Sequence, residues 1–166
     1  MCGLPFSGKS TLAREVASAT KSKIVSFDEL WAEKNMEKPI PQGVDGWRFV
    51  RGLALEEIEK FLIAGFSVVY DDANARKEHR QELKEIAKRT NAKGVIVYLN
   101  TPIEFIKKRE MRNITIEERH QVEEKNFQEV FDQFEVPETD ENVVEFRPGT
   151  DINQWVNKLP KSEHLS

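Results

Sequence analysis

The chain of 166 residues is long enough to bury a core of its own, because hydrophobic residues make up 39% of it. Its net charge of −4 provides no overall attraction to nucleic acid or anionic lipid, although it does not exclude a local basic groove. One cysteine and three scattered histidines exclude an internal disulfide and offer no zinc-ligand spacing. No apolar run approaches the ~20 residues of a membrane span and no signal peptide precedes the first motif, so we expect a cytoplasmic protein.

The first motif, GLPFSGKS over residues 3–10, fits the phosphate-binding pattern G-x-x-x-x-G-K-[S/T] without a mismatch. Its two glycines let the backbone curl around a phosphate chain, and the exposed amides of the following helix favour the same anion. In such a loop Lys9 reaches the β- and γ-phosphates and the Ser10 hydroxyl ligates Mg²⁺. A Gly/Ser turn that only caps a helix is the alternative. The residues that we expect to bind a nucleoside triphosphate are Gly3, Pro5, Phe6, Ser7, Gly8, Lys9, Ser10 and Thr11.

The strand that normally carries such a loop is truncated or absent, because only Met1 and Cys2 precede Gly3. Loss of a central strand would leave backbone groups of its two neighbours unpaired and a hole in the core. We therefore favour a first strand whose upstream residues are absent from this sequence, with Met1 inside it. The alternative is a sheet without its central member.

Strand and helix patterns alternate along the rest of the chain. Apolar residues at helical spacing predict helices over residues 10–19, 28–35, 47–64, 77–90, 103–111, 116–134 and 152–159. Short apolar runs predict strands over residues 23–27, 66–70, 94–99 and 143–146. Pro39, Pro41, Gly43 and Gly46 indicate a loop, and residues 161–166 a frayed tail. This order predicts an α/β fold, a single domain over residues 1–160 with a mostly parallel sheet and helices on both faces.

Two predicted strands end on acidic residues, at the edge where parallel sheets bind ligands. Asp28 could accept the proton of an attacking hydroxyl, or it could cap the following helix. Asp71 follows an apolar strand, as in the Walker-B arrangement, in which the carboxylate orients Mg²⁺ or its water shell. A turn or strand-cap aspartate is the alternative. Asp72 is the less secure candidate for the metal.

Basic residues cluster near the end of the helix predicted over residues 103–111. Arg109 and Arg112 are three residues apart, so they share a helix face and could converge on one anion. Arginines on a mobile lid can close over a transferring phosphoryl group, whereas a solvated basic helix end is the alternative. Asn74 and Arg80 could contact acceptor or phosphate, although Asn74 could equally be a helix N-cap.

Together these motifs resemble the small P-loop kinases of the AAA_33 type, relatives of the polynucleotide 5′-kinase and zeta-toxin groups. The resemblance rests on the loop at residues 3–11, SFDEL at 26–30, VVYDDAN at 68–74, YLNTP at 98–102 and FEVPE at 134–138. It implies the three-layer fold of P-loop NTPases of the nucleoside-kinase type, with residues 143–149 near the adenine. It also implies that Asp28 activates the acceptor hydroxyl and that Arg109 and Arg112 close over the phosphates. Phe6 departs from the pattern because a small residue often stands there, and Asp72 because an alanine is usual.

The sequence thus predicts a phosphotransferase that moves the γ-phosphoryl group of ATP to a hydroxyl on a small molecule or nucleic-acid end. ATP and Mg²⁺ are the expected cofactors, and no obligate protein partner and no membrane are expected. Residues 30–47 are expected to cover the acceptor, whose identity the sequence does not give. The alternative is an ATP-binding regulatory module that hydrolyses slowly and has no acceptor. Such a switch needs neither a base at Asp28 nor arginines over the phosphates.

Overall fold

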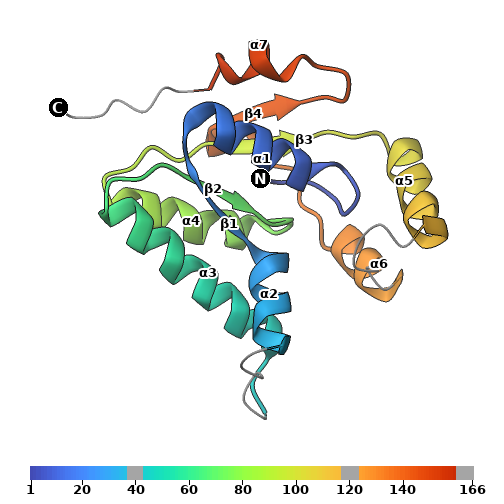
Figure 1. The fold of residues 1–166 in the computed structure, drawn as a ribbon, viewed down its shortest axis with the longest axis horizontal. Coiled ribbons are helices and arrows are strands. Elements are labelled where there is room, and N and C mark those ends of the chain that lie inside the picture. Colours follow the sequence, from blue (N-terminus) through green and yellow to red (C-terminus); the bar gives the residue numbers. More distant parts are fainter. Residues whose placement is uncertain (37–42, 117–123, 160–166) are drawn as a thin grey trace.

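The computed structural model describes residues 1–36, 43–116 and 124–159. Helices and strands alternate through most of the chain, as the sequence predicts (Figure 1). The helices are α1 (Lys9–Thr20), α2 (Phe27–Met36), α3 (Gly46–Ile63), α4 (Lys77–Arg89), α5 (Ile103–Ile116), α6 (Glu124–Asp132), α7 (Ile152–Val156) and a 3-10 turn, η1 (Thr139–Glu141). The strands are β1 (Lys23–Ser26), β2 (Val68–Asp71), β3 (Ile96–Leu99) and β4 (Val143–Phe146).

The strands form two parallel pairs, β1 with β2 and β3 with β4. Met1 and Cys2 lie between the pairs: the Met1 amino group donates to the Tyr70 carbonyl of β2 at 2.6 Å, and Cys2 forms a parallel bridge with Tyr98 of β3. The Cys2 N–H donates to the Val97 carbonyl at 2.8 Å, and the Leu99 N–H donates to the Cys2 carbonyl at 2.9 Å. Met1 and Cys2 therefore occupy the place expected for the first strand, between the two pairs, although they form an isolated bridge and not a strand.

Helices cover both faces of the strands (Figure 1). α3 contacts β1, β2 and α4, and the buried side chains between them include Val25, Val50 and Tyr70. α1 contacts β1, β2 and α7, and its Leu12 and Val16 belong to a second cluster with side chains of β3 and α7. These apolar clusters give the three-layer α/β arrangement and fix the carboxyl ends of β1 and β2 beside the start of α1. No helix among the described residues is both long and apolar enough to cross a membrane.

The predicted elements agree with the structure except near the ends of some helices and strands: β2 (Val68–Asp71) is predicted over residues 66–70, and β3 (Ile96–Leu99) over residues 94–99. The predicted break after residue 111 is wrong, because α5 continues to Ile116. Arginine, asparagine and threonine cost little inside a helix, so a polar stretch is a weak signal for a helix end. The last helix is shorter than predicted and ends at Val156. Three predictions fall on segments outside the described residues, which are 37–42, 117–123 and 160–166. They are the loop at Pro39 and Pro41, the first part of the helix predicted over 116–134, and the frayed tail at 161–166.

Candidate functional site

The loop between Cys2 and α1 provides an open helix N-terminus. α1 begins after Gly8, whose φ of 105° places it in the left-handed region, and no side chain caps the helix there. Amides at an uncapped helix start point outward and carry the positive end of the helix dipole, so they favour an anion. Gly3 has little room for a side chain: a Cβ at this position would lie 3.1 Å from Ser7 Oγ and 3.2 Å from the Leu99 carbonyl oxygen. The loop therefore depends on glycine at both ends of the motif.

Lys9 bends back over this loop. Its ammonium group donates to the Leu4 carbonyl at 2.9 Å. Burial lowers the pKa of Lys9 from its usual value, and the negative charges of Asp71, Asp72 and Asp28 oppose that effect. The side chain therefore lies within electrostatic reach of all three carboxylates that the sequence singles out. A phosphate bound on the loop would offer Lys9 a charged partner in place of a neutral carbonyl.

The register of β1 and β2 explains how these carboxylates come together. Ser26 pairs with Asp71, so both strands end at the same level of the sheet. Asp71 is the last residue of β2 and is half-buried, whereas Asp28 is the second residue of α2 and is exposed. The predicted base and metal acid thus lie at one edge, close to the loop.

Asp72 has a different environment from Asp71. Its carboxylate accepts from Arg51 at 3.1 Å and from the Ala73 N–H at 2.7 Å, and its side chain is only 9% exposed. Arg51 also donates to Glu82 and to the His79 carbonyl, which joins α3 to α4 and to the end of β2. Asp72 is therefore part of a buried ion-pair network, and Asp71 is the better placed of the two to hold a metal.

Arg51 is a residue that the sequence analysis missed. It stands in a helix among apolar and charged residues, where an arginine is typical of a solvated face. The structure buries it, with 4% of its surface exposed, and its guanidinium lies 5.4 Å from the ring centroid of Trp47. Only the buried position, which depends on how α3 packs, distinguishes it from an ordinary surface arginine.

Asn74 and Arg80 are buried, and their side chains hydrogen-bond within the fold, which does not favour the expected contact with acceptor or phosphate. Asn74 is buried, and its side-chain amide donates to the Met1 carbonyl at 2.9 Å. It does not cap α4, whose N-cap is Arg76. Arg80 forms an ion pair with Glu141 at 2.8 Å and also donates to the carbonyls of Asn74, Ala75 and Glu135. These bonds hold the chain after α6 against the turn that follows β2.

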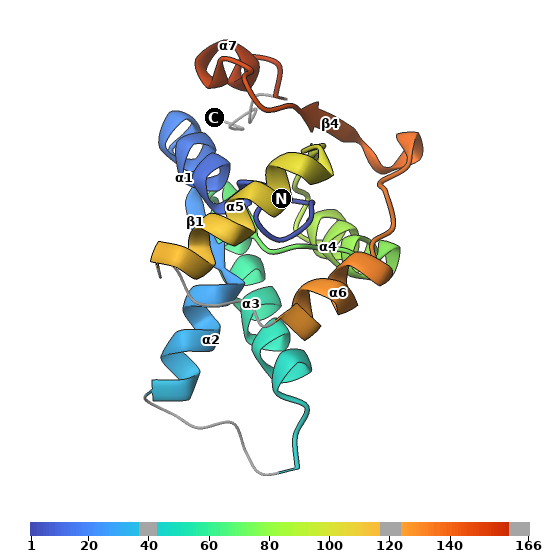
Figure 2. The same ribbon diagram turned by 90° about the vertical axis from the view of Figure 1, so that its right-hand side faces the viewer.

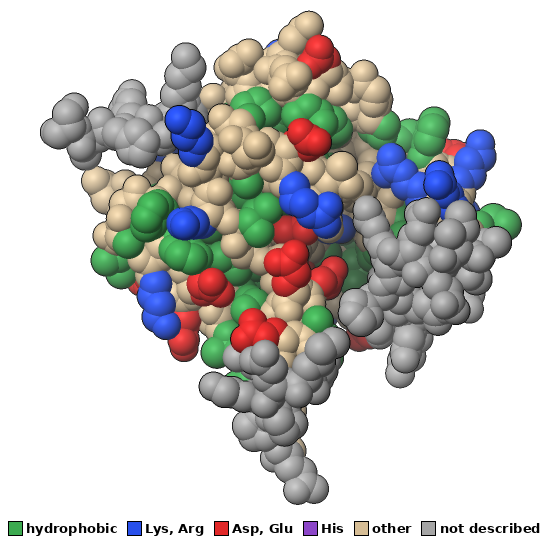
Figure 3. Space-filling model, viewed as in Figure 1, with side chains coloured by type: hydrophobic (Ala, Val, Ile, Leu, Met, Phe, Trp, Pro, Cys, Tyr) green, Lys and Arg blue, Asp and Glu red, His purple; other side chains and the backbone are tan. Residues whose placement is uncertain are grey.

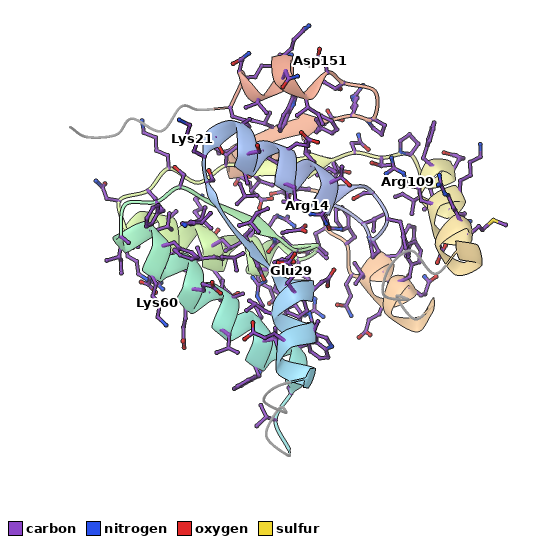
Figure 4. All side chains as sticks on the ribbon, in the orientation of Figure 1. Arg14, Lys21, Glu29, Lys60, Arg109 and Asp151 are labelled. Atoms are coloured by element: carbon purple, nitrogen blue, oxygen red, sulfur yellow. The ribbon has the colours of Figure 1, made fainter. Side chains whose placement is uncertain are left out.

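Arg109 of α5 contacts the loop directly. Its guanidinium donates to the Phe6 carbonyl at 3.1 Å and to the Ser7 carbonyl at 2.7 Å. Thr101 donates its hydroxyl to the same Ser7 carbonyl at 3.0 Å. Figure 4 shows the Arg109 side chain on α5, and Figure 1 and Figure 2 show α5 and α6 near the loop. The expected lid arginine thus reaches the phosphate-binding loop, while Arg112 lines the cavity beside it.

A cavity of about 460 Å³ opens next to the loop. Its walls come from the loop and the start of α1, from α5, and from the segment between β4 and α7. The lining residues include Phe6, Gly8, Thr11, Arg109, Arg112, Pro148, Gly149 and Thr150. The resemblance implies that residues 143–149 lie near an adenine, and Phe146, Pro148 and Gly149 of that segment line the cavity. Its size suits the base and sugar of a nucleotide.

Aromatic and acidic residues lie around the start of α2, next to Asp28. Trp47 is 39% exposed, and its ring centroid lies 5.8 Å from that of Phe27 and 4.9 Å from that of His79. In Figure 3, Asp and Glu side chains gather near the start of α2, where Figure 4 labels Glu29. The face next to Asp28 is therefore acidic with an aromatic border.

The oxygen donors near the loop suit Mg²⁺, which needs few protein ligands, better than a metal ion that protein side chains coordinate completely. No group of three or more His, Cys, Asp or Glu side chains among the described residues could hold a metal ion. Mg²⁺ usually takes one or two protein oxygens and completes its shell with phosphates and water. Ser10, in the first turn of α1, and Asp71, at the end of β2, are oxygen donors of this kind.

The family model AAA_33, described as an AAA domain, matches residues 1–137 of this chain. The chain belongs to this family. An L-seryl-tRNA(Sec) kinase from Methanococcus maripaludis is 27% identical over 150 residues, which cover 84% of this chain and 52% of the kinase. The chain thus spans about half the length of this curated relative.

Solved structures support the same fold. Kti12 of Chaetomium thermophilum in complex with ADP-AlF3 superposes with a TM-score of 0.77 at 18% identity, over 95% of this chain and 94% of Kti12. A sugar kinase from Janibacter superposes with a TM-score of 0.65 at 23% identity, over 94% of this chain and 87% of that chain. The AAA_33 chain described here therefore has the fold of P-loop kinases.

Proposed function

We propose that this protein is a kinase that uses ATP and Mg²⁺ to phosphorylate a hydroxyl group. One observation carries the proposal: an uncapped helix start and Lys9 lie at the sheet edge that also bears Asp71 and Asp28. Loop amides and a lysine are suited to bind a triphosphate, and an acid next to them is suited to a reaction of its γ-phosphoryl group. Residues 1–160 act as a single domain in this proposal.

The phosphates bind to the backbone N–H groups of Phe6, Ser7, Gly8 and Thr11. Gly3 and Pro5, which has no N–H to donate, shape the turn around them. Lys9 leaves the Leu4 carbonyl and contacts the β- and γ-phosphates. Ser10 and Asp71 would hold Mg²⁺, which would supply positive charge next to the phosphates. The adenine occupies the cavity beside Pro148 and Gly149.

Asp28 accepts the proton of the acceptor hydroxyl as its oxygen attacks the γ-phosphorus. The bond between that phosphorus and the bridging oxygen breaks, and ADP leaves. Arg109 and Arg112 stabilise the negative charge on the transferred group after α5 closes. Most of the rate enhancement comes from positioning and electrostatics, because phosphoryl transfer needs little covalent chemistry from the protein.

The acceptor is the open part of the proposal. Relatives and structural neighbours include an L-seryl-tRNA(Sec) kinase, a gluconokinase and an APS kinase, so their names point to different acceptors. The panel to test therefore contains seryl-tRNA, gluconate and other sugars, adenylyl sulfate, nucleosides and oligonucleotide 5′ ends. Transfer of ³²P from γ-labelled ATP to one of them identifies the acceptor. Slow ATP loss that no acceptor accelerates favours the regulatory module instead.

Two substitutions test the assignment of roles. We expect Lys9→Ala to lower transfer at least ~10²-fold, as for loss of one aimed donor. We expect Asp28→Asn to abolish transfer while ATP affinity stays close to that of the wild type, because Asp28 faces the acceptor. Lys21→Ala and Glu29→Gln are matched controls, since both residues are exposed and one stands beside Asp28. Near-normal turnover of Lys9→Ala contradicts the proposal, and a large loss of ATP binding in Asp28→Asn makes that residue structural.

A further inference from the structure

Phe6 stands at a backbone position that disfavours it. Its φ of 59° lies in the left-handed region, which glycine adopts at no steric cost and most other residues avoid. The loop itself does not need this side chain, because backbone amides hold phosphate. A bulky residue at such a position therefore calls for a compensating contact.

That contact comes from α6. The Phe6 ring centroid lies 6.3 Å from that of Phe127, which is only 8% exposed. Phe127 in turn stacks on Phe131 with a centroid separation of 6.3 Å, and Phe131 is 43% exposed. Aromatic pairs at this separation attract each other in tilted and offset geometries. Phe127 is thus an α6 side chain that contacts the phosphate-binding loop.

The same loop residue is also held through its backbone. Arg109 of α5 donates to the Phe6 carbonyl at 3.1 Å and to the next carbonyl, that of Ser7, at 2.7 Å. α6 therefore holds the side chain of Phe6 while α5 holds its carbonyl. Figure 1 and Figure 2 show both helices near this loop.

We propose that Phe127 is a positioning residue, which fixes the phosphate-binding loop through its ring contact with Phe6 and so raises nucleotide affinity. The proposal rests on the proposed function, because it assigns the nucleotide to this loop. A loop fixed in its binding conformation loses less conformational freedom when the nucleotide binds. The contact also orders α6, since the buried ring of Phe127 packs against the loop.

The variants Phe6→Gly, Phe127→Ala and their double mutant test this contact, with Phe127→Leu as the conservative variant and Phe131→Ala as the control. Phe6→Gly suits the left-handed backbone, so we expect its melting temperature to stay at or above that of the wild type. Amide hydrogen exchange of the nucleotide-free protein should become about tenfold faster in α6 of Phe6→Gly and unchanged in α3. Equal exchange in α6 of Phe6→Gly and the wild type overturns the contact, whether or not the protein binds ATP.

Titration calorimetry with ATP and Mg²⁺ then tests the coupling to the nucleotide. We expect Phe6→Gly and Phe127→Ala each to weaken binding about fivefold, with the double mutant no weaker than either. Phe127→Leu should recover most of the affinity and Phe131→Ala should bind like the wild type. Multiplicative losses, or unchanged affinity in both single mutants, overturn the positioning role. If Phe127→Ala does not fold, Phe6→Gly alone decides between these outcomes, whereas a wild type that binds no ATP overturns the proposed function itself.

Discussion

Asp71 and Asp72 are adjacent in the chain but differ in what holds them. Arg51 and a backbone amide bind Asp72, whereas Asp71 is a half-buried strand end that contributes to the electrostatic environment of Lys9. We expect Asp71→Asn to lower Mg²⁺-dependent transfer about 10²-fold at nearly unchanged stability. Asp72→Asn should instead destabilise the fold by about 3 kcal/mol, because it removes the buried one of the two carboxylates that pair with Arg51 and leaves only the exposed Glu82. Magnesium titrations of the transfer rate and thermal unfolding measure the two effects, and a reversed pattern would assign the metal to Asp72.

Gly3 and Gly52 offer a matched pair for the role of glycine. A Cβ at Gly3 meets Ser7 Oγ at 3.1 Å and backbone at 3.2 Å, whereas a Cβ at Gly52 of α3 meets nothing within 4 Å. We expect Gly3→Ala to destabilise the protein by about 1–3 kcal/mol and Gly52→Ala to stabilise it by up to about 1 kcal/mol. Denaturant unfolding of both variants measures this difference. Equal stability of the two would show that the loop tolerates a side chain at Gly3.

The residues predicted from motifs differ from those that only the structure reveals. Lys9, Asp28 and Asp71 stand out in the sequence because a loop motif and strand ends have recognisable spacing, and the structure brings them to one edge. Their roles stay predictions until the variants are measured. Arg51 has no such local signal, because its partner Asp72 lies 21 residues away and meets it only through the packing of α3.

At the scale of elements, a buried ion pair joins α4 to η1. Arg80 holds Glu141 at 2.8 Å, and this hydrogen bond lowers the pKa of the Glu141 carboxyl below its usual value. A lowered folded-state pKa stabilises the protein above the unfolded pKa of 4.5, and that stability is lost as pH falls through the lower folded value. We expect Glu141→Gln to lose about 3 kcal/mol at neutral pH and to show a smaller further loss below pH 4.5 than the wild type.

Thermal unfolding of both proteins between neutral pH and about pH 3 measures this contribution. Glu145→Gln is the control, because that carboxylate pairs with Arg147 at an exposed site and its loss should change stability by less than about 1 kcal/mol. Parallel pH profiles of the wild type and Glu141→Gln would contradict a stabilising role for the Arg80 pair.

Periodicity predicts most helices and strands, because apolar faces have to meet the core. α3 and α4 illustrate this success, since their predicted and observed ends agree within one residue. α5 illustrates the limit, because no strong stop signal follows Met111 and the helix continues to Ile116. Cys2 shows a second limit of prediction from sequence. Two residues are too few to be predicted as a strand, and the pairing of Cys2 is seen only in its hydrogen bonds to β3.

At the scale of the whole molecule, the loop lies where the two strand pairs meet. Met1 and Cys2 lie between β2 and β3, Gly3 donates its N–H to the Ala73 carbonyl, and α5 and α6 hold Phe6 and Ser7. We expect a ligand on the loop to stabilise the fold, because the segment that carries the loop bonds to both strand pairs. Such a ligand should stabilise the protein by about 2.7 kcal/mol at a concentration 100 times its Kd.

Titration calorimetry of ATP into the folded protein with Mg²⁺ measures directly whether the loop at residues 3–10 binds a nucleotide. We expect binding at one site with a measurable heat in the wild type and in Lys21→Ala, and loss of that heat in Lys9→Ala. Thermal unfolding of the same samples verifies that each is folded. Absence of heat with every purine triphosphate plus Mg²⁺, or equal affinity in Lys9→Ala and the wild type, would contradict nucleotide binding by this loop.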